Sequence, residues 1–261
     1  MIVRIAVAAL LLALLFALAE FTPLPLFLAA SSAVAILSAH ELGKLLQHYN
    51  CSLYPLTYLL TAGLPWSWIY LADHRSEILL AVPFLILAWS LPAVKDLAQG
   101  LPSASGNLLT LFYLGIPLCL LADFANGPHN HLWLVFTAVW AGDAAALFVG
   151  RTWGRRRVTP RLSPNKTLEG YLAAIAAAVL ASALAGNWLF PEHSAGYLIL
   201  AGAVIGVSGI LGDLFESLLK RGAQVKDSSH LLPGHGGLLD RIDSLLFALP
   251  GYYFLVRLVG G

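Results

Sequence analysis

Charged residues are scarce in this chain, and their scarcity limits the kind of protein it can be. Lys, Arg, Asp and Glu make up 11% of its 261 residues, whereas a typical soluble domain has roughly 25%. Hydrophobic residues make up 59% of the chain. So few charges cannot cover a water-facing surface, so the sequence excludes an ordinary soluble domain and predicts that lipid surrounds most of it.

Other absences exclude further classes of protein. The net charge is only +1, which does not favour a nucleic-acid partner. The two cysteines, Cys51 and Cys119, lie far apart in apolar stretches, and no CxxC or Cys/His pairing predicts a zinc site or a disulfide framework. No GxxxxGK[ST] loop is present, so any nucleotide phosphates must be held in another way.

Apolar runs long enough to cross a bilayer recur along the whole chain. A helical span needs about 20 residues, and backbone groups in hydrocarbon must be satisfied within a helix. The predicted fold is therefore an all-α, polytopic helix bundle with about nine transmembrane helices. The ranges are 5–21, 23–39, 53–72, 76–94, 106–124, 131–150, 170–190, 195–213 and 244–260.

The distribution of Lys and Arg predicts the orientation of these spans. With nine spans and a cytoplasmic N-terminus, every Lys and Arg except Arg75 and Arg257 falls at the cytoplasmic side. An eight-span count would place one large basic loop on the opposite side. The run at 5–21 also resembles a cleavable secretory signal, because Arg4 precedes it and Ala17-Leu18-Ala19 fits a cleavage site.

The chain reads as one membrane domain, residues 1–261, without a long linker or repeat. Residues 1–130 are mostly apolar spans, and residues 131–261 form a catalytic half with cytosolic loops at 151–169 and 216–243. Ten basic residues lie in these loops. Seven of the 14 carboxylates lie in the loops or at the span ends beside them: Asp143, Glu169, Asp213, Glu216, Asp227, Asp240 and Asp243. Because ionisable groups near membrane depth are costly, this concentration predicts a functional site.

The spacing of the polar residues indicates what this site can do. Asp213, Glu216 and Lys220 are spaced i, i+3, i+7 and so share one face of a continuing helix. Asp240 and Asp243 are one helical turn apart, which would let them share a metal. Carboxylates that hold a divalent cation, with Lys and Arg that bind phosphate, are what nucleotidyl transfer requires.

A gap-free stretch of 27 residues carries a family resemblance. It runs Ser217-Leu218-Leu219-Lys220-Arg221, then Lys226-Asp227, then Pro233-Gly234-His235-Gly236-Gly237-Leu238-Leu239-Asp240-Arg241-Ile242-Asp243. This stretch resembles the phosphatidate cytidylyltransferase motif.

A second stretch is similar to the other cytosolic loop of that family. It consists of Gly142-Asp143-Ala144-Ala145-Ala146, Gly150-Arg151 and Ser163-Pro164-Asn165-Lys166-Thr167-Leu168-Glu169-Gly170. The family usually has Tyr where this chain has Ala146, and Lys-Lys-Thr where it has Asn165-Lys166-Thr167. Lys166 is therefore the expected functional lysine. Residues 140–250 match well, and the N-terminal 130 residues match only as a run of spans.

The resemblance implies an activity and its setting. It implies transfer of CMP from CTP to phosphatidate, giving CDP-diacylglycerol and pyrophosphate. It also implies Mg²⁺, at two divalent sites or at one divalent and one monovalent site, together with a homodimer. The expected location is the cell inner (plasma) membrane, with the active site facing the cytoplasm.

The resemblance also implies roles for individual residues. The expected catalytic residues are Asp213, Lys226, Asp227 and Asp240. The expected metal ligands are Asp143, Asp227, Asp240 and Asp243. The expected substrate-binding residues are Ser163, Lys166, Thr167, Lys220, Arg221, His235, Gly236, Gly237 and Arg241.

Several of these residues could have a structural role in place of a catalytic or binding role. His235 could cap a turn, Asp243 could pair with Arg241 or cap the last helix, and Glu216 could pair with Lys220. For Glu41, at the end of the second run, the sequence suggests only a place beside a lipid entrance.

Three rival functions remain at the level of sequence. The same chemistry on an archaeal isoprenoid ether phosphate would leave the same headgroup motifs. A CDP-alcohol phosphotransferase is disfavoured because its DGxxAR pattern is absent. A transporter would place ionisable residues within spans and would show inverted repeats, whereas here these residues gather at one side.

Overall fold

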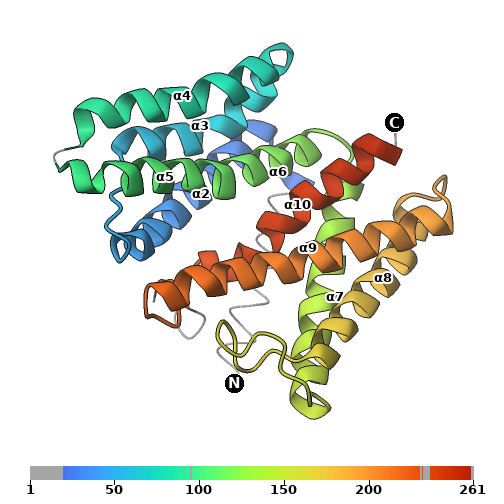
Figure 1. Cartoon of the computed structure of the whole chain (residues 1–261). Helices are drawn as coiled ribbons and strands as arrows, with labels where there is room; N and C mark the ends of the chain where they lie inside the picture. The colour runs from blue at the N-terminus through green and yellow to red at the C-terminus, as the bar shows by residue number, and fades with distance from the viewer. Residues whose placement is uncertain (1–19, 95, 230, 232–235, 260–261) are drawn as a thin grey trace. The chain divides into compact units, whose positions relative to one another are not determined.

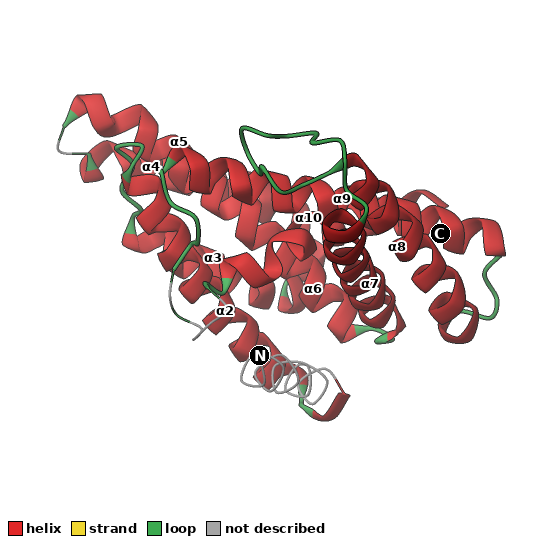
Figure 2. Cartoon of the chain, turned by 90° about the horizontal axis from the view of Figure 1, so that it is seen from below, coloured by secondary structure: helices red, strands yellow, loops and turns green. Residues whose placement is uncertain are grey.

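The computed structural model describes residues 20–94, 96–229, 231 and 236–259. The described residues are almost all helical, with one isolated bridge between Arg157 and Thr167 and no strand among them (Figure 2). This confirms the predicted all-α fold. Seven helical stretches of the described chain are long and apolar enough to cross a membrane. Nearly all of the first predicted run, 5–21, lies outside the described residues. Its interpretation as a cleavable signal therefore stays a prediction.

The described residues divide into two compact units. The described residues within 20–129 and 222–241 form the first, and those within 130–221 and 242–259 form the second. The polar segment 222–241 therefore belongs with the N-terminal helices, although helices of the second unit flank it in sequence.

The described residues of the first unit form five α-helices that begin within it (Figure 1). These are α2 (Leu24–Gln47), α3 (Pro55–Tyr70), α4 (Arg75–Ala93), α5 (Gly100–Thr110) and α6 (Ile116–Asn126), with short 3-10 turns at Ala72–His74 and Leu97–Gln99. Pro23 and Pro25 lie at the start of α2, where a missing N–H costs nothing, so they begin the helix rather than break it. α3 has 16 residues, fewer than the roughly 20 that a span usually needs.

A buried amide joins the helices of the first unit. Asn107 of α5 is fully buried, and its side-chain oxygen accepts from the Tyr54 N–H at 2.8 Å and from the Thr57 hydroxyl at 2.5 Å. Its nitrogen donates to the carbonyl oxygens of Ser52 and Ser103 at 2.9 and 2.7 Å. Since an unsatisfied buried amide is costly, this complete set of bonds fixes α5 against the start of α3.

The second unit contains α7 (Asn130–Thr152), α8 (Leu168–Leu189), α9 (Ala195–Gly222) and most of α10 (Leu239–Val259). Glycines let α8 and α9 approach closely. A Cβ added at Gly202 would lie 2.5 Å from Val179 Cα, and one at Gly206 would lie 3.0 Å from Ala178 Cβ. The small-residue face Gly202–Gly206 therefore packs two helices within one chain.

Candidate functional site

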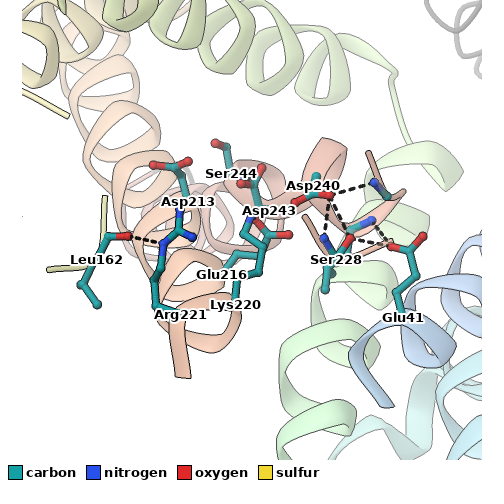
Figure 3. A network of polar contacts seen from close by, with 12 residues as sticks. Glu41, Leu162, Asp213, Glu216, Lys220, Arg221, Ser228, Asp240, Asp243 and Ser244 are labelled. Carbon is teal, nitrogen blue, oxygen red and sulfur yellow. Dashed lines mark hydrogen bonds and ion pairs between the residues drawn. The ribbon is translucent and has the colours of Figure 1, made fainter. Parts of the chain in front are cut away.

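In the first unit, the polar segment 222–241 is bound to α2 through one carboxylate, Glu41. This side chain is 2% exposed. Its Oε1 accepts from the Ser229 hydroxyl at 2.6 Å and from the Leu238 N–H at 3.0 Å. Its Oε2 accepts from the Ser228 hydroxyl at 3.0 Å and from the Leu239 N–H at 2.8 Å (Figure 3). Four donors thus satisfy a buried charge, as a buried carboxylate requires.

Asp240, in the first turn of α10, is held from the same segment. Its Oδ2 accepts from the Ser228 N–H at 3.0 Å and from the Gly237 N–H at 2.8 Å. The Ser228 hydroxyl oxygen also lies 3.0 Å from Oδ2, and its single proton is donated to one of the two carboxylates, Glu41 or Asp240, at a time. Ser228 therefore contacts Glu41 and Asp240 with one hydroxyl group (Figure 3). The result is a carboxylate whose orientation is fixed by backbone and side-chain donors.

Asp227 and Asp240 lie against the same glycine. Gly236 has φ +81°, a conformation that favours glycine. A Cβ added there would lie 2.8 Å from Asp240 Oδ2 and 3.8 Å from Asp227 Cβ. The absence of a side chain at Gly236 therefore leaves room beside two of the predicted metal ligands.

In the second unit, α9 carries the predicted polar face. Asp213, Glu216 and Lys220 lie on this one helix, as their spacing predicts. Glu216 is fully buried and forms an ion pair with Lys220, one helical turn later. The structure therefore shows the structural pairing that the sequence left open for Glu216.

Lys166 approaches the same helix from the loop between α7 and α8. Its Nζ lies 2.8 Å from Asp213 Oδ2. Burial lowers the pKa of Lys166, but the negative charges of Asp213 and Asp143 outweigh it, so the pKa lies above its usual value. Lys166 therefore keeps its positive charge throughout the neutral pH range.

Two further carboxylates lie near this ion pair in the second unit. Asp243 of α10 is close enough to Asp213 and Asp143 for their charges to interact, and its Oδ1 accepts from the Ser244 N–H at 2.8 Å. The Ser244 hydroxyl lies 3.4 Å from Asp143 Oδ1. Helices α7, α9 and α10 thus each supply an aspartate to one neighbourhood, which concentrates negative charge there.

The loop between α7 and α8 is ordered by its own backbone contacts. Glu169 accepts from the N–H groups of Arg155 and Arg156 at 3.0 and 3.2 Å. The Thr167 side chain accepts from the Gly170 N–H at 3.2 Å and caps α8. Arg221 of α9 donates to the Leu162 carbonyl at 3.1 Å (Figure 3). Thr167 and Arg221 therefore have structural contacts, and their binding of substrate stays a prediction.

The structure distributes the predicted site residues between the two units. The first unit contains Lys226, Asp227, Gly236, Gly237, Asp240 and Arg241. The second unit contains Asp143, Ser163, Lys166, Thr167, Asp213, Lys220, Arg221 and Asp243. His235 lies outside the described residues, as does His230.

Glu41 is the residue of this network that sequence reasoning missed. Its partners are 187 to 198 positions away, beyond any local pattern. The available signal was the position of a carboxylate at the end of an apolar helix, where ionisable groups are functional by default.

The carboxylates were also tested as ligands for a metal ion. Among the described residues, no three His, Cys, Asp or Glu side chains form a group that holds a metal as it stands. The donor type nevertheless fits a hard divalent cation, which prefers carboxylate oxygens and keeps several waters. In the first unit, Asp227 and Asp240 are the carboxylates of this donor type that lie against one residue, Gly236.

Comparison with known proteins shows the family to which this chain belongs. The model of the Cytidylyltransferase family matches residues 2–259. An uncharacterized protein of Escherichia coli, YnbB, is 38% identical over 207 residues, which cover 75% of this chain and 69% of the relative. The phosphatidate cytidylyltransferase of Thermotoga maritima is 36% identical over 184 residues, 67% of each chain.

The phosphatidate cytidylyltransferase of Haemophilus influenzae is also similar to this chain. It is 40% identical over 161 residues. These residues make up 58% of this chain and 56% of the relative, so the match spans a little over half the length of that protein.

Proposed function

Because this chain belongs to the cytidylyltransferase family, we propose that it is a CTP:phosphatidate cytidylyltransferase of the membrane. The match of the family model to residues 2–259 carries this proposal. In the proposed reaction, an oxygen of the phosphatidate phosphate attacks the α-phosphorus of CTP. The bond from that phosphorus to the β-phosphate oxygen breaks, pyrophosphate leaves, and CDP-diacylglycerol remains in the bilayer.

The chemistry of this reaction matches the charges of the site. The attacking phosphate is already an anion and needs no strong general base, so positioning and electrostatic stabilisation supply most of the rate. Lys166, held by Asp213, is positioned to bind a phosphate group. Lys220, Arg221, Lys226 and Arg241 are the further cations that we assign to CTP and pyrophosphate, and we assign Ser163 and Thr167 to the phosphate of one substrate.

A divalent cation, Mg²⁺, belongs to the proposal. When bound, it would neutralise phosphate charge and stabilise the leaving group. Asp227 and Asp240 would hold it in the first unit, while Asp143 and Asp243 are the candidates in the second. The Ser228 and Gly237 donors would keep the Asp240 carboxylate oriented toward such an ion.

The setting is proposed from the charge map and the resemblance. The protein is a multi-pass membrane protein, and an excess of Lys and Arg in the loops 151–169 and 216–243 supports a cytoplasmic active site. We assign it to the inner (plasma) membrane, as a homodimer.

The proposal is tested with radiolabelled CTP, phosphatidate and the purified protein in detergent. We expect lipid-soluble label from the wild type only when Mg²⁺ is present, and a loss of at least about 100-fold in Asp240→Asn, since that variant lacks a charge that balances the metal. Glu192→Asn, an exposed loop position, serves as the matched control.

Three outcomes are decisive for this experiment. Label that appears without metal would contradict the metal site. Label that appears only with isoprenoid ether phosphates would replace the lipid substrate. No transfer to either lipid would contradict the enzymatic function.

A further inference from the structure

The Glu41 carboxylate is bound in a way that only a carboxylate can reproduce. Each of its two oxygens accepts one hydroxyl and one backbone N–H. A hydroxyl can rotate, but the N–H groups of Leu238 and Leu239 have fixed directions. A glutamine at this position would point its NH₂ group at one of these N–H groups whichever way the amide is turned, so two donors would oppose each other.

The residues that Glu41 binds adjoin Asp240 in two ways, one along the chain and one by direct contact. Leu238 and Leu239 directly precede Asp240 and start the turn that carries it. Ser228 donates its backbone N–H to Asp240 while its hydroxyl contacts both carboxylates (Figure 3). Bonds from α2 to Ser228 and to Leu238 and Leu239 therefore hold both the residue that contacts the Asp240 carboxylate and the residues that directly precede Asp240.

The packing around the carboxylate leaves little room for the segment to shift. A Cβ added at Gly237 would lie 2.5 Å from Glu41 Oε2 and would also overlap the Ser228 hydroxyl. Gly237 in turn donates its N–H to Asp240. The segment, the Glu41 carboxylate and the Asp240 carboxylate therefore form one packed assembly within the first unit.

We propose that Glu41 is a positioning residue for the nucleotidyl transfer: it anchors Ser228, Ser229, Leu238 and Leu239 to α2 and so holds the Asp240 carboxylate in its working orientation. This inference rests on the proposed function, because it assigns Glu41 a role through Asp240. It assigns no contact between Glu41 and substrate.

The test compares the wild type with Glu41→Gln, and uses Glu77→Gln as the matched control. Glu77 is an exposed carboxylate on α4 that accepts from its neighbour Ser76 at 3.0 Å. We expect Glu41→Gln to lower kcat about 10- to 100-fold while KM for CTP changes less than about threefold, because misplacing a catalytic group slows the chemical step. We expect Glu77→Gln to match the wild type.

Hydrogen exchange supplies a readout that does not depend on activity. In Glu41→Gln we expect the amides of Leu238, Leu239 and Ser228 to exchange at least about tenfold faster. Leu238 and Leu239 lose the carboxylate to which they donate, and Ser228 loses the bond from its hydroxyl to Glu41 that holds it in place. Amides in the cores of α3 and α6 should exchange as in the wild type. A uniform acceleration across the first unit would show general destabilisation and overturn the positioning role.

A milder variant keeps the proposal testable if Glu41→Gln does not fold. Ser229→Ala removes the 2.6 Å bond to Glu41 Oε1 and no bond to Asp240. We expect a several-fold loss of kcat in the same direction, with faster exchange at Leu238. We also expect that Ser229→Ala adds no further loss in the Glu41→Gln background, because both changes act on one anchor.

The outcomes separate this inference from the proposed function. Unchanged exchange at Leu238 and Leu239 overturns the anchor, and faster exchange with unchanged kcat overturns its role in catalysis. If the wild type transfers no label to any lipid phosphate, the proposed function fails. The exchange data then still decide whether Glu41 orders the segment.

Discussion

The ion pair of Lys166 and Asp213 shows how single residues shape the site. Lys166 comes from a loop and Asp213 from the apolar helix α9, and their charged atoms lie 2.8 Å apart. Two more aspartates, Asp143 and Asp243, lie close enough to this pair to interact with it electrostatically. Binding of phosphate by Lys166 and of a cation by these carboxylates stays a proposal, and a metal-dependent transfer would use both.

At this scale we predict that Lys166→Met loses roughly 100-fold in kcat/KM for CTP transfer, as expected when one charged stabilising donor is removed. Because the aspartates raise the pKa of Lys166, the lysine is fully charged on both sides of neutrality. The ratio of wild-type to variant activity should therefore be the same at pH 6.5 and pH 8.5.

Arg155→Gln is the control for Lys166→Met. The Arg155 side chain is exposed, and its contact with Glu169 is made by the backbone. An activity ratio that falls sharply between the two pH values would mean that Lys166 titrates in this range, against the direction of its pKa shift.

Some of these residues could be predicted from the sequence and others could not. Asp213, Glu216 and Lys220 share a face because the period of the helix fixes their directions, and that prediction is confirmed. The partners of Glu41 depend on tertiary contacts across 187 positions, which no local spacing encodes.

Helices in this protein continue beyond the apolar runs that reveal them. α9 was expected at 195–213 and ends at Gly222, and α2 was expected at 23–39 and ends at Gln47. Hydropathy falls where polar residues begin, but backbone hydrogen bonding does not stop there. The extra turns carry Glu41 in α2 and the Glu216–Lys220 pair in α9, so polar residues with buried partners lie beyond the ends of these apolar runs.

One helix contains a feature that the apolar pattern does not indicate. Residues Leu111–Gly115, between α5 and α6, form a π-helical turn. Pro117 follows it, and its ring would clash with the carbonyl of Tyr113, four residues earlier, to which it cannot donate. The wider turn accommodates the proline without ending the helix.

At the scale of the element we predict that Gly202→Ala separates α8 from α9. The added Cβ would lie 2.5 Å from Val179 Cα and 2.7 Å from the Ala178 carbonyl oxygen. Both are backbone atoms, so no change of side-chain rotamer can relieve the clash. We expect a loss of about 1–3 kcal/mol in unfolding free energy, seen as a lower thermal midpoint in detergent.

Gly63→Ala is the matched change in another helix. Nothing lies within 4 Å of its added Cβ, so its effect should stay within about 0.5 kcal/mol. Equal midpoints for the two variants would mean that α8 and α9 tolerate a wider spacing.

At the scale of the whole molecule, the sequence predicts membrane character more readily than it predicts division into units. The apolar runs indicate a polytopic protein, and the seven candidate spans of the described residues agree. Nine spans and a cytoplasmic N-terminus remain predictions. The assignment of residues 222–241 to the first unit depends on contacts such as those of Glu41, which follow from the fold and not from chain order.

We predict that cysteine labelling reveals the orientation. Arg156→Cys should react with an impermeant maleimide only in inverted vesicles, and Glu192→Cys only in right-side-out vesicles, because Lys and Arg favour the cytoplasmic side. The native cysteines give little background, since Cys51 and Cys119 are 3% and 1% exposed. Burial raises the pKa of Cys51 to about 11, which keeps its thiol protonated and unreactive.

The opposite pattern of labelling would reverse the orientation. Labelling of both positions in the same vesicles would contradict the placement of α8 as a span between them.

The distance along the chain between Glu41 and its donors has a consequence for biogenesis. The ribosome makes α2 long before it makes residues 228–239. The nascent helix therefore enters the membrane before the hydrogen-bond donors of its Glu41 carboxylate exist. During that interval the carboxylate must retain water, a proton or a chaperone, since it cannot be buried alone. A copy whose synthesis stops before residue 228 never receives these donors. Its α2 therefore keeps an acidic group that a finished chain encloses with donors made almost two hundred residues later.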